Sequence, residues 1–140
     1  MPKLLCFLPC EKVIIDQNAN TISMINVLEG ISVPKAPTPD AGVLLTWSIV
    51  SVWEQTEGDA RKTYEQRTYL LLPDGKEKVD LITRFQFAQK RHRLIGTING
   101  FPVPLAGDYI LKLFLRELGS EQWIPIADYT LPVEHTDSKQ

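Results

Sequence analysis

Turn residues interrupt this sequence at short, fairly even intervals, and their spacing limits the folds open to it. Clusters rich in Gly, Pro, Asn, Asp and Ser recur from Asp16 to Ser120. The segments between them are short and rich in Val, Ile, Leu, Thr and aromatic residues. Such segments are typical of strands joined by turns, and they leave no room for the regular helices of a βαβ protein. The sequence therefore predicts an all-β domain.

The alternation of apolar and polar residues supports individual strands. Residues 43–54 are apolar on both faces, which predicts a strand covered on both sides, whereas residues 79–87 alternate as a half-buried strand does. Residues 63–72 run into Pro73-Asp74-Gly75-Lys76, in which Pro sets φ and Gly accepts a positive φ. We expect an antiparallel hairpin there.

Two segments fit more than one structure. Residues 108–118 match both a helical stripe and a strand, but the glycines on either side favour a strand that leads into a hairpin with residues 122–133. Residues 55–66 contain helix-forming side chains, but Gly58 limits any helix there to a turn or two.

The expected architecture is a two-layer antiparallel β-sandwich, immunoglobulin-like with Greek-key connections and seven to nine strands. Trp47, Tyr109, Leu111 and Leu113 are its predicted core residues. The chain of 140 residues fits a single domain, which we place at residues 1–135, followed by a disordered tail at residues 136–140.

The run Gly107-Asp108-Tyr109-Ile110-Leu111-Lys112-Leu113 resembles the late strand of many immunoglobulin-like and fibronectin-like sandwiches. In residues 10–16, 64–75 and 99–102 above all, the chain also resembles a family of small uncharacterised bacterial proteins of about this length. That family has no assigned activity. The resemblance implies a compact bacterial β domain and transfers no functional residue.

The charge balance limits the classes of partner. The formal net charge is −2 and the pI is about 5.7, so the surface as a whole does not attract nucleic acid or anionic membranes. Residues 43–53 form the longest stretch without charges or turn residues, far short of the roughly 18 residues that span a bilayer. Residues 4–8 are too few for a signal-peptide core. We expect a cytoplasmic protein with no nucleic-acid or membrane partner.

Motifs for catalysis or metal binding are missing. Cys6 and Cys10 lie roughly 13 Å apart if extended, so we expect two reduced thiols, while His92 and His135 are too distant in sequence for a usual zinc pattern. There is no nucleophile elbow and no phosphate-binding glycine pattern. A dyad of Cys10 with His92 stays open, because such pairs form between distant residues. We expect no cofactor and no enzymatic activity.

Three segments stand out as candidate contacts or connections. Lys90, Arg91 and Arg93 form a basic run that could hold an anion or an acidic partner, although a solvated connection that contributes little to folding is the plainer interpretation. Residues 99–105 place Phe101, Val103 and Leu105 in an expected loop, either as a plug for one end of the sandwich or as an exposed contact. The proline-rich residues 34–39 predict a stiff connection between sheets.

The leading functional hypothesis is a non-catalytic interaction or structural module that binds a protein partner or itself through a loop end or a sheet edge. The alternative is an enzyme or small-ligand-binding protein whose site is assembled from scattered polar residues. A deep pocket that gathers His92 or Cys10 with acidic residues favours the alternative. A flat, apolar, self-complementary patch favours the module.

Overall fold

The computed structural model describes residues 1–34 and 42–136, and these residues form strands and turns without a helix. The prediction of an all-β chain is confirmed. The strands are β1 (Lys3–Asp16), β2 (Thr21–Val27), β3 (Ile31–Pro34), β4 (Gly42–Glu54), β5 (Thr63–Leu71), β6 (Glu77–Gln86), β7 (Arg91–Pro102), β8 (Gly107–Glu117) and β9 (Ile124–Thr136). The described residues accordingly hold no helix of the length and hydrophobicity that a bilayer crossing requires.

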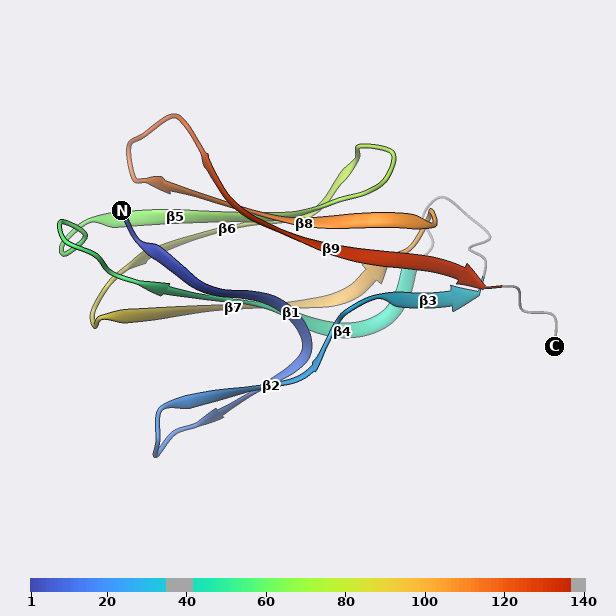
Figure 1. Cartoon of the computed structure of the whole chain (residues 1–140), viewed down its shortest axis with the longest axis horizontal. Helices are drawn as coiled ribbons and strands as arrows, with labels where there is room; N and C mark the ends of the chain where they lie inside the picture. Colours follow the sequence, from blue (N-terminus) through green and yellow to red (C-terminus); the bar gives the residue numbers. More distant parts are fainter. Residues whose placement is uncertain (35–41, 137–140) are drawn as a thin grey trace.

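The strands form two sheets, with the orders β2-β1-β4-β7 and β3-β9-β8-β5-β6. Figure 1 shows β5, β8 and β9 above β1, β4 and β7. Three hairpins, β1–β2, β5–β6 and β8–β9, stay within one sheet, and every other connection crosses between the sheets. One of these crossings brings β3 beside β9 in parallel, so the expectation of purely antiparallel pairing is wrong at that edge. A crossover permits parallel pairing, which a tight hairpin does not.

The core lies between the two sheets. The predicted core residues Trp47, Tyr109, Leu111 and Leu113 are all fully buried. Aromatic rings meet across the layers: the rings of Trp53 on β4 and Phe85 on β6 have their centroids 6.2 Å apart. This burial of large apolar side chains is the main stabilising contribution to the fold.

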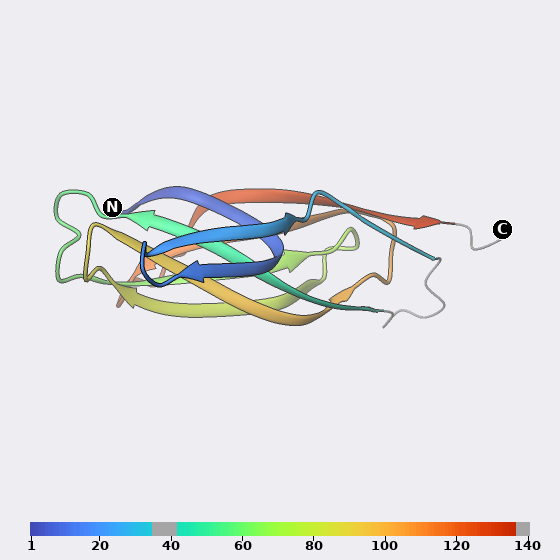
Figure 2. The same ribbon diagram turned by 90° about the horizontal axis from the view of Figure 1, so that it is seen from below.

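Strand β1 is shared between two neighbours. Its first part pairs with β4 from Lys3 to Cys10, and its second part pairs with β2 from Cys10 to Asp16. In the view of Figure 2, the β1–β2 hairpin lies in front of β4 and β7, on the side away from the larger sheet. Residues on both faces of β4 are buried, for example Trp47 and Val50, which confirms the prediction of a strand covered on both sides.

The ambiguous segments are resolved in favour of strands and turns. Residues 108–118 belong mainly to β8, and residues 55–66 form turns followed by the start of β5. The expected β5–β6 hairpin turns at Gly75, whose φ is +87°. The expected loop at residues 99–105 is wrong in its first half, because β7 continues to Pro102. The predicted tail at residues 136–140 is wrong for Thr136, because this residue is the last of β9. Residues 137–140 and the proline-rich segment after Pro34 lie outside the described residues.

Candidate functional site

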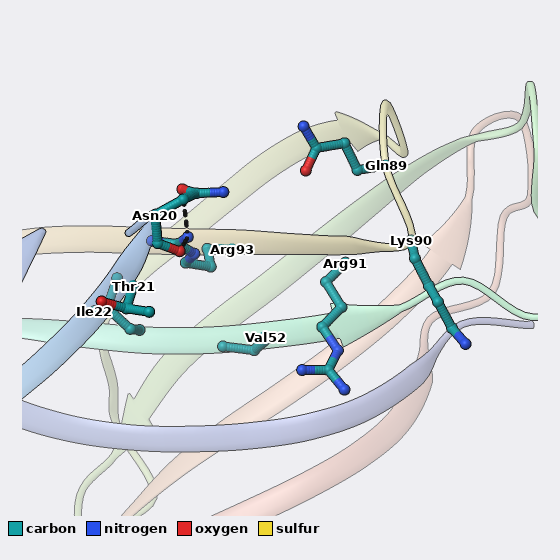
Figure 3. A pocket seen from close by; sticks show the side chains of 8 residues that line it. All are labelled: Asn20, Thr21, Ile22, Val52, Gln89, Lys90, Arg91 and Arg93. Atoms are coloured by element: carbon teal, nitrogen blue, oxygen red, sulfur yellow. Dashed lines mark hydrogen bonds between the residues drawn. The ribbon is translucent and has the colours of Figure 1, made fainter. Parts of the chain in front are cut away.

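The basic run lies at one end of a groove between the β1–β2 turn and the start of β7 (Figure 3). Lys90 precedes β7, whereas Arg91 and Arg93 are residues of β7 itself, so the interpretation of the run as a connection between strands is wrong for both arginines. The groove has a volume of about 620 Å³. Its lining residues are Asn20, Thr21, Ile22, Val52, Gln89, Lys90, Arg91 and Arg93.

Each of the three cations has a partner. The Arg93 guanidinium donates hydrogen bonds to the backbone oxygen and to Oδ1 of Asn20, both at 2.7 Å. Arg91 Nε lies 3.5 Å from one carboxylate oxygen of Glu54, and Lys90 Nζ lies 3.9 Å from the other. Arg93 therefore ties the β1–β2 turn to β7, a contact that the interpretation of the run as a solvated connection did not include, and what this contact contributes to folding stays a prediction.

The groove combines positive charge with an apolar floor. Of its three cations, Lys90 and Arg91 share the carboxylate of Glu54 and Arg93 is bonded to Asn20, while Ile22 and Val52 supply apolar surface. Lys90 and Arg91 have mostly exposed side chains and retain N–H donors beyond their contact with Glu54. This arrangement suits the binding of a carboxylate or another anionic group.

The predicted apolar contact residues behave differently from one another. Phe101 and Val103 are buried, and the Phe101 ring packs against Trp47 with a centroid separation of 5.1 Å. An exposed contact through these two residues is therefore wrong, and the interpretation as a plug is the one that fits. Leu105 is 38% exposed, and its backbone holds the hydroxyl of Tyr109. In the sequence, apolar residues near proline look the same whether they form an exposed binding loop or pack into the core. Only the packing of the folded chain determines which of them point inward.

The cysteines and His92 do not form a common site. Both thiols are free, and burial raises the pKa of Cys6 and of Cys10. Cys10 lies beside Ser48 of β4, and His92 lies beside Trp53 of the same strand. These two positions are five residues apart, so Cys10 and His92 are separated by roughly 17 Å along β4. The His92 ring stacks on Phe85 at 5.1 Å, and burial lowers its pKa. The dyad left open above is therefore not formed, and within the described ranges no cluster of His, Cys, Asp and Glu could hold a metal ion.

Strand β2 is a candidate interaction surface that sequence reasoning did not locate. It is an edge of the four-stranded sheet, and its sequence Thr-Ile-Ser-Met-Ile-Asn-Val contains neither a charge nor a proline. Ile25 on this strand is 37% exposed, and Ile14 on the facing part of β1 is exposed as well. The uncharged run is visible in the sequence, but its position at an edge depends on the pairing of the whole sheet.

The other edges carry features that discourage pairing with a further strand. Strand β3 has four residues and ends in Pro34, and β6 contains the charged residues Glu77, Lys78, Asp80 and Arg84. Strand β7, the other edge of the four-stranded sheet, begins with two arginines and ends in Pro102. Short edges, prolines and charges are the usual protection against edge-to-edge association. Strand β2 lacks all three.

Comparison with known proteins adds no family to this description. No protein-family model matches the sequence, and a search of curated proteins produced no significant match.

Proposed function

We propose that this protein is a non-catalytic interaction module that associates with a second copy of itself through the edge of β2. The observation that carries the proposal is the unprotected edge, a seven-residue strand without charge or proline. The outward N–H and C=O groups of an edge strand pair readily with another strand. The separation of Cys10 from His92 supports a binding role over catalysis.

The sequence of β2 is compatible with antiparallel pairing to itself. A twofold axis at Met24 places Ser23 of one copy opposite Ile25 of the other, and no like charges meet. The two four-stranded sheets then become one continuous sheet of eight strands. Because the same patch serves on both subunits, the assembly closes as a dimer.

Charge complementarity favours a second copy as the occupant. Glu29 follows the end of β2 and is exposed, and Asn20 at the end of the basic groove directly precedes β2, so antiparallel pairing brings the Glu29 end of one copy towards the groove of the other. Two symmetric contacts then bring an acidic side chain towards Lys90 and Arg91. Exposed ion pairs weaken with salt, so the dimer should loosen as ionic strength rises.

The test is the mass of the full chain in solution, measured by sedimentation and by light scattering on a sizing column. We expect a dimer for the wild-type protein and a monomer for Ile25→Lys, because a charge on β2 repels its symmetry mate. The control is Ile82→Lys on β6, where the isoleucine is 56% exposed and lies on the other sheet. A wild-type monomer at high concentration, or equal effects of the two substitutions, would refute the proposal.

We also propose that the two sheets form an immunoglobulin-like Greek-key sandwich. The five crossings between sheets support this topology, as does the Tyr109 hydroxyl, which bonds to the backbone of Leu105 four residues earlier. A tyrosine that bonds back across such a corner is a hallmark of these sandwiches. Membership of the small bacterial family and a cytoplasmic location without nucleic-acid or membrane partners belong to the same proposal, and the net charge of −2 agrees with the lack of such partners.

A further inference from the structure

We propose that the opening between β6 and β7 binds a small, mainly apolar molecule that carries one hydrogen-bond-accepting carbonyl oxygen. These strands are edges of different sheets, so no ladder of backbone hydrogen bonds closes the side of the fold between them. A cleft of about 280 Å³ lies there. No residue of β2 lines this cleft, so binding there does not depend on self-association.

The lining of the cleft is divided by chemistry. Apolar surface comes from Ile49, Leu81, Leu94 and Ile95, and polar groups come from Gln66, Thr68 and Thr83. Arg93 also lines the cleft, but its guanidinium is bonded to Asn20. Ligand sites commonly combine a mainly apolar wall with a few convergent polar groups. At roughly 30 Å³ per water, the volume corresponds to about nine waters, which limits the ligand to a small molecule.

The side chain of Gln66 provides the main polar contact. Only 6% of this residue is exposed, and its Oε1 accepts hydrogen bonds from Ser51 Oγ and Trp53 Nε1, both at 2.7 Å. These two bonds fix which end of the amide is oxygen. Among the described residues no acceptor pairs with Nε2, so its two N–H groups remain available beside the cleft. No fully buried side-chain nitrogen or oxygen among the described residues lacks a hydrogen-bond partner, so Nε2 is open to solvent in the cleft, and a carbonyl oxygen bound there would accept its hydrogen bonds in place of water.

Two further residues shape the cleft. A Cβ at position 96 would lie 3.2 Å from Leu81 Cδ1, so Gly96 lets the Leu81 side chain of β6 pack closely against β7 at one wall of the cleft. Thr83 shares a face of β6 with the buried Phe85, two residues later, yet Thr83 is exposed. Thr83 therefore lies at the mouth of the cleft. A ligand would therefore enter past Thr83, direct its oxygen towards Gln66 and rest its apolar part on Leu81 and Leu94.

The experiment titrates the ¹⁵N-labelled full chain with hexanamide and follows amide and indole signals by NMR. We expect saturable shifts of the Gln66 side-chain N–H₂ and of the Trp53 indole N–H, with a dissociation constant of about 1–20 mM for so small a probe. The Trp47 indole, which donates to the Gly100 carbonyl, serves as an internal reference that stays unchanged.

Variants separate the cleft from general surface binding. Thr83→Phe should block the mouth and weaken binding at least tenfold, whereas Thr83→Val, which keeps the volume, should stay within about twofold of wild type. Gln66→Glu keeps an acceptor for Ser51 and Trp53 but removes the N–H₂ donors, and it should also lose binding. A dispersed spectrum verifies that each variant is folded. The proposal is overturned if the Gln66 and Trp53 signals do not move saturably by about 100 mM probe, or if Thr83→Phe binds as well as wild type.

Discussion

The hydroxyl of Tyr109 offers a sharp test of how the sheets are joined at the β7–β8 crossing. It donates to the Leu105 carbonyl at 2.7 Å and accepts from the Leu105 N–H at 3.2 Å, while the rest of the ring is buried against Phe101. The substitution Tyr109→Phe removes one oxygen and keeps the ring. It therefore isolates two hydrogen bonds from the packing of the core.

The expected cost follows from those bonds. Each contributes about 0.5–1.5 kcal/mol net, so Tyr109→Phe should lower the free energy of unfolding by about 1–3 kcal/mol. For a chain of 140 residues this corresponds to a decrease in melting temperature of about 3–12 °C. Urea melts at constant slope should show the same loss as a lower midpoint.

The control is Tyr69→Phe, on the outer face of the larger sheet, where the ring stacks on Phe114 at 5.4 Å and is partly exposed. It should change stability by less than about 0.5 kcal/mol. If Tyr109→Phe were equally mild, the corner would not hold the crossing, and the argument for a Greek-key corner from this hydroxyl would be lost.

Three further predictions concern the core, pH and the basic groove. Leu111→Ala should cost about 2–5 kcal/mol in denaturant melts, because this fully buried residue leaves a cavity, and a loss below about 0.5 kcal/mol would contradict its placement. Burial alone would raise the pKa of Asp59, but hydrogen bonds from Tyr64 and Thr56 outweigh this effect and lower the pKa. The ionised Asp59 carboxylate therefore stabilises the fold above about pH 5, and this stabilisation is lost as pH falls below about 4. Melts of Asp59→Asn at several pH values should lack this contribution. Arg93→Ala should cost about 0.5–1.5 kcal/mol, more than Arg91→Ala, because only Arg93 bonds to Asn20; equal losses would show that this tie is unimportant.

The candidate sites show how far local patterns reach. The basic run was visible in the sequence, but its place on β7 and its bonds to Asn20 depend on a hairpin some 70 residues earlier in the chain. Phe101 and Val103 lie near prolines and were expected in a loop, yet the ladder between β7 and β4 extends to Pro102 and draws Phe101 into the core. Whether an apolar side chain is buried depends on its partners, which a local window does not contain.

The sequence by itself determined the all-β class, the β5–β6 and β8–β9 hairpins and the core positions of Trp47, Tyr109 and Leu111. These follow from period-two alternation and from turn chemistry, which act between residues close in the chain. Only the tertiary structure decided the parallel pairing of β3 with β9, the exposed edge of β2 and the cleft beside Gln66. Strand order arises from long-range pairing and sheet packing, and many orders satisfy the same local pattern, so edges and gaps between sheets appear only when the whole chain is assembled.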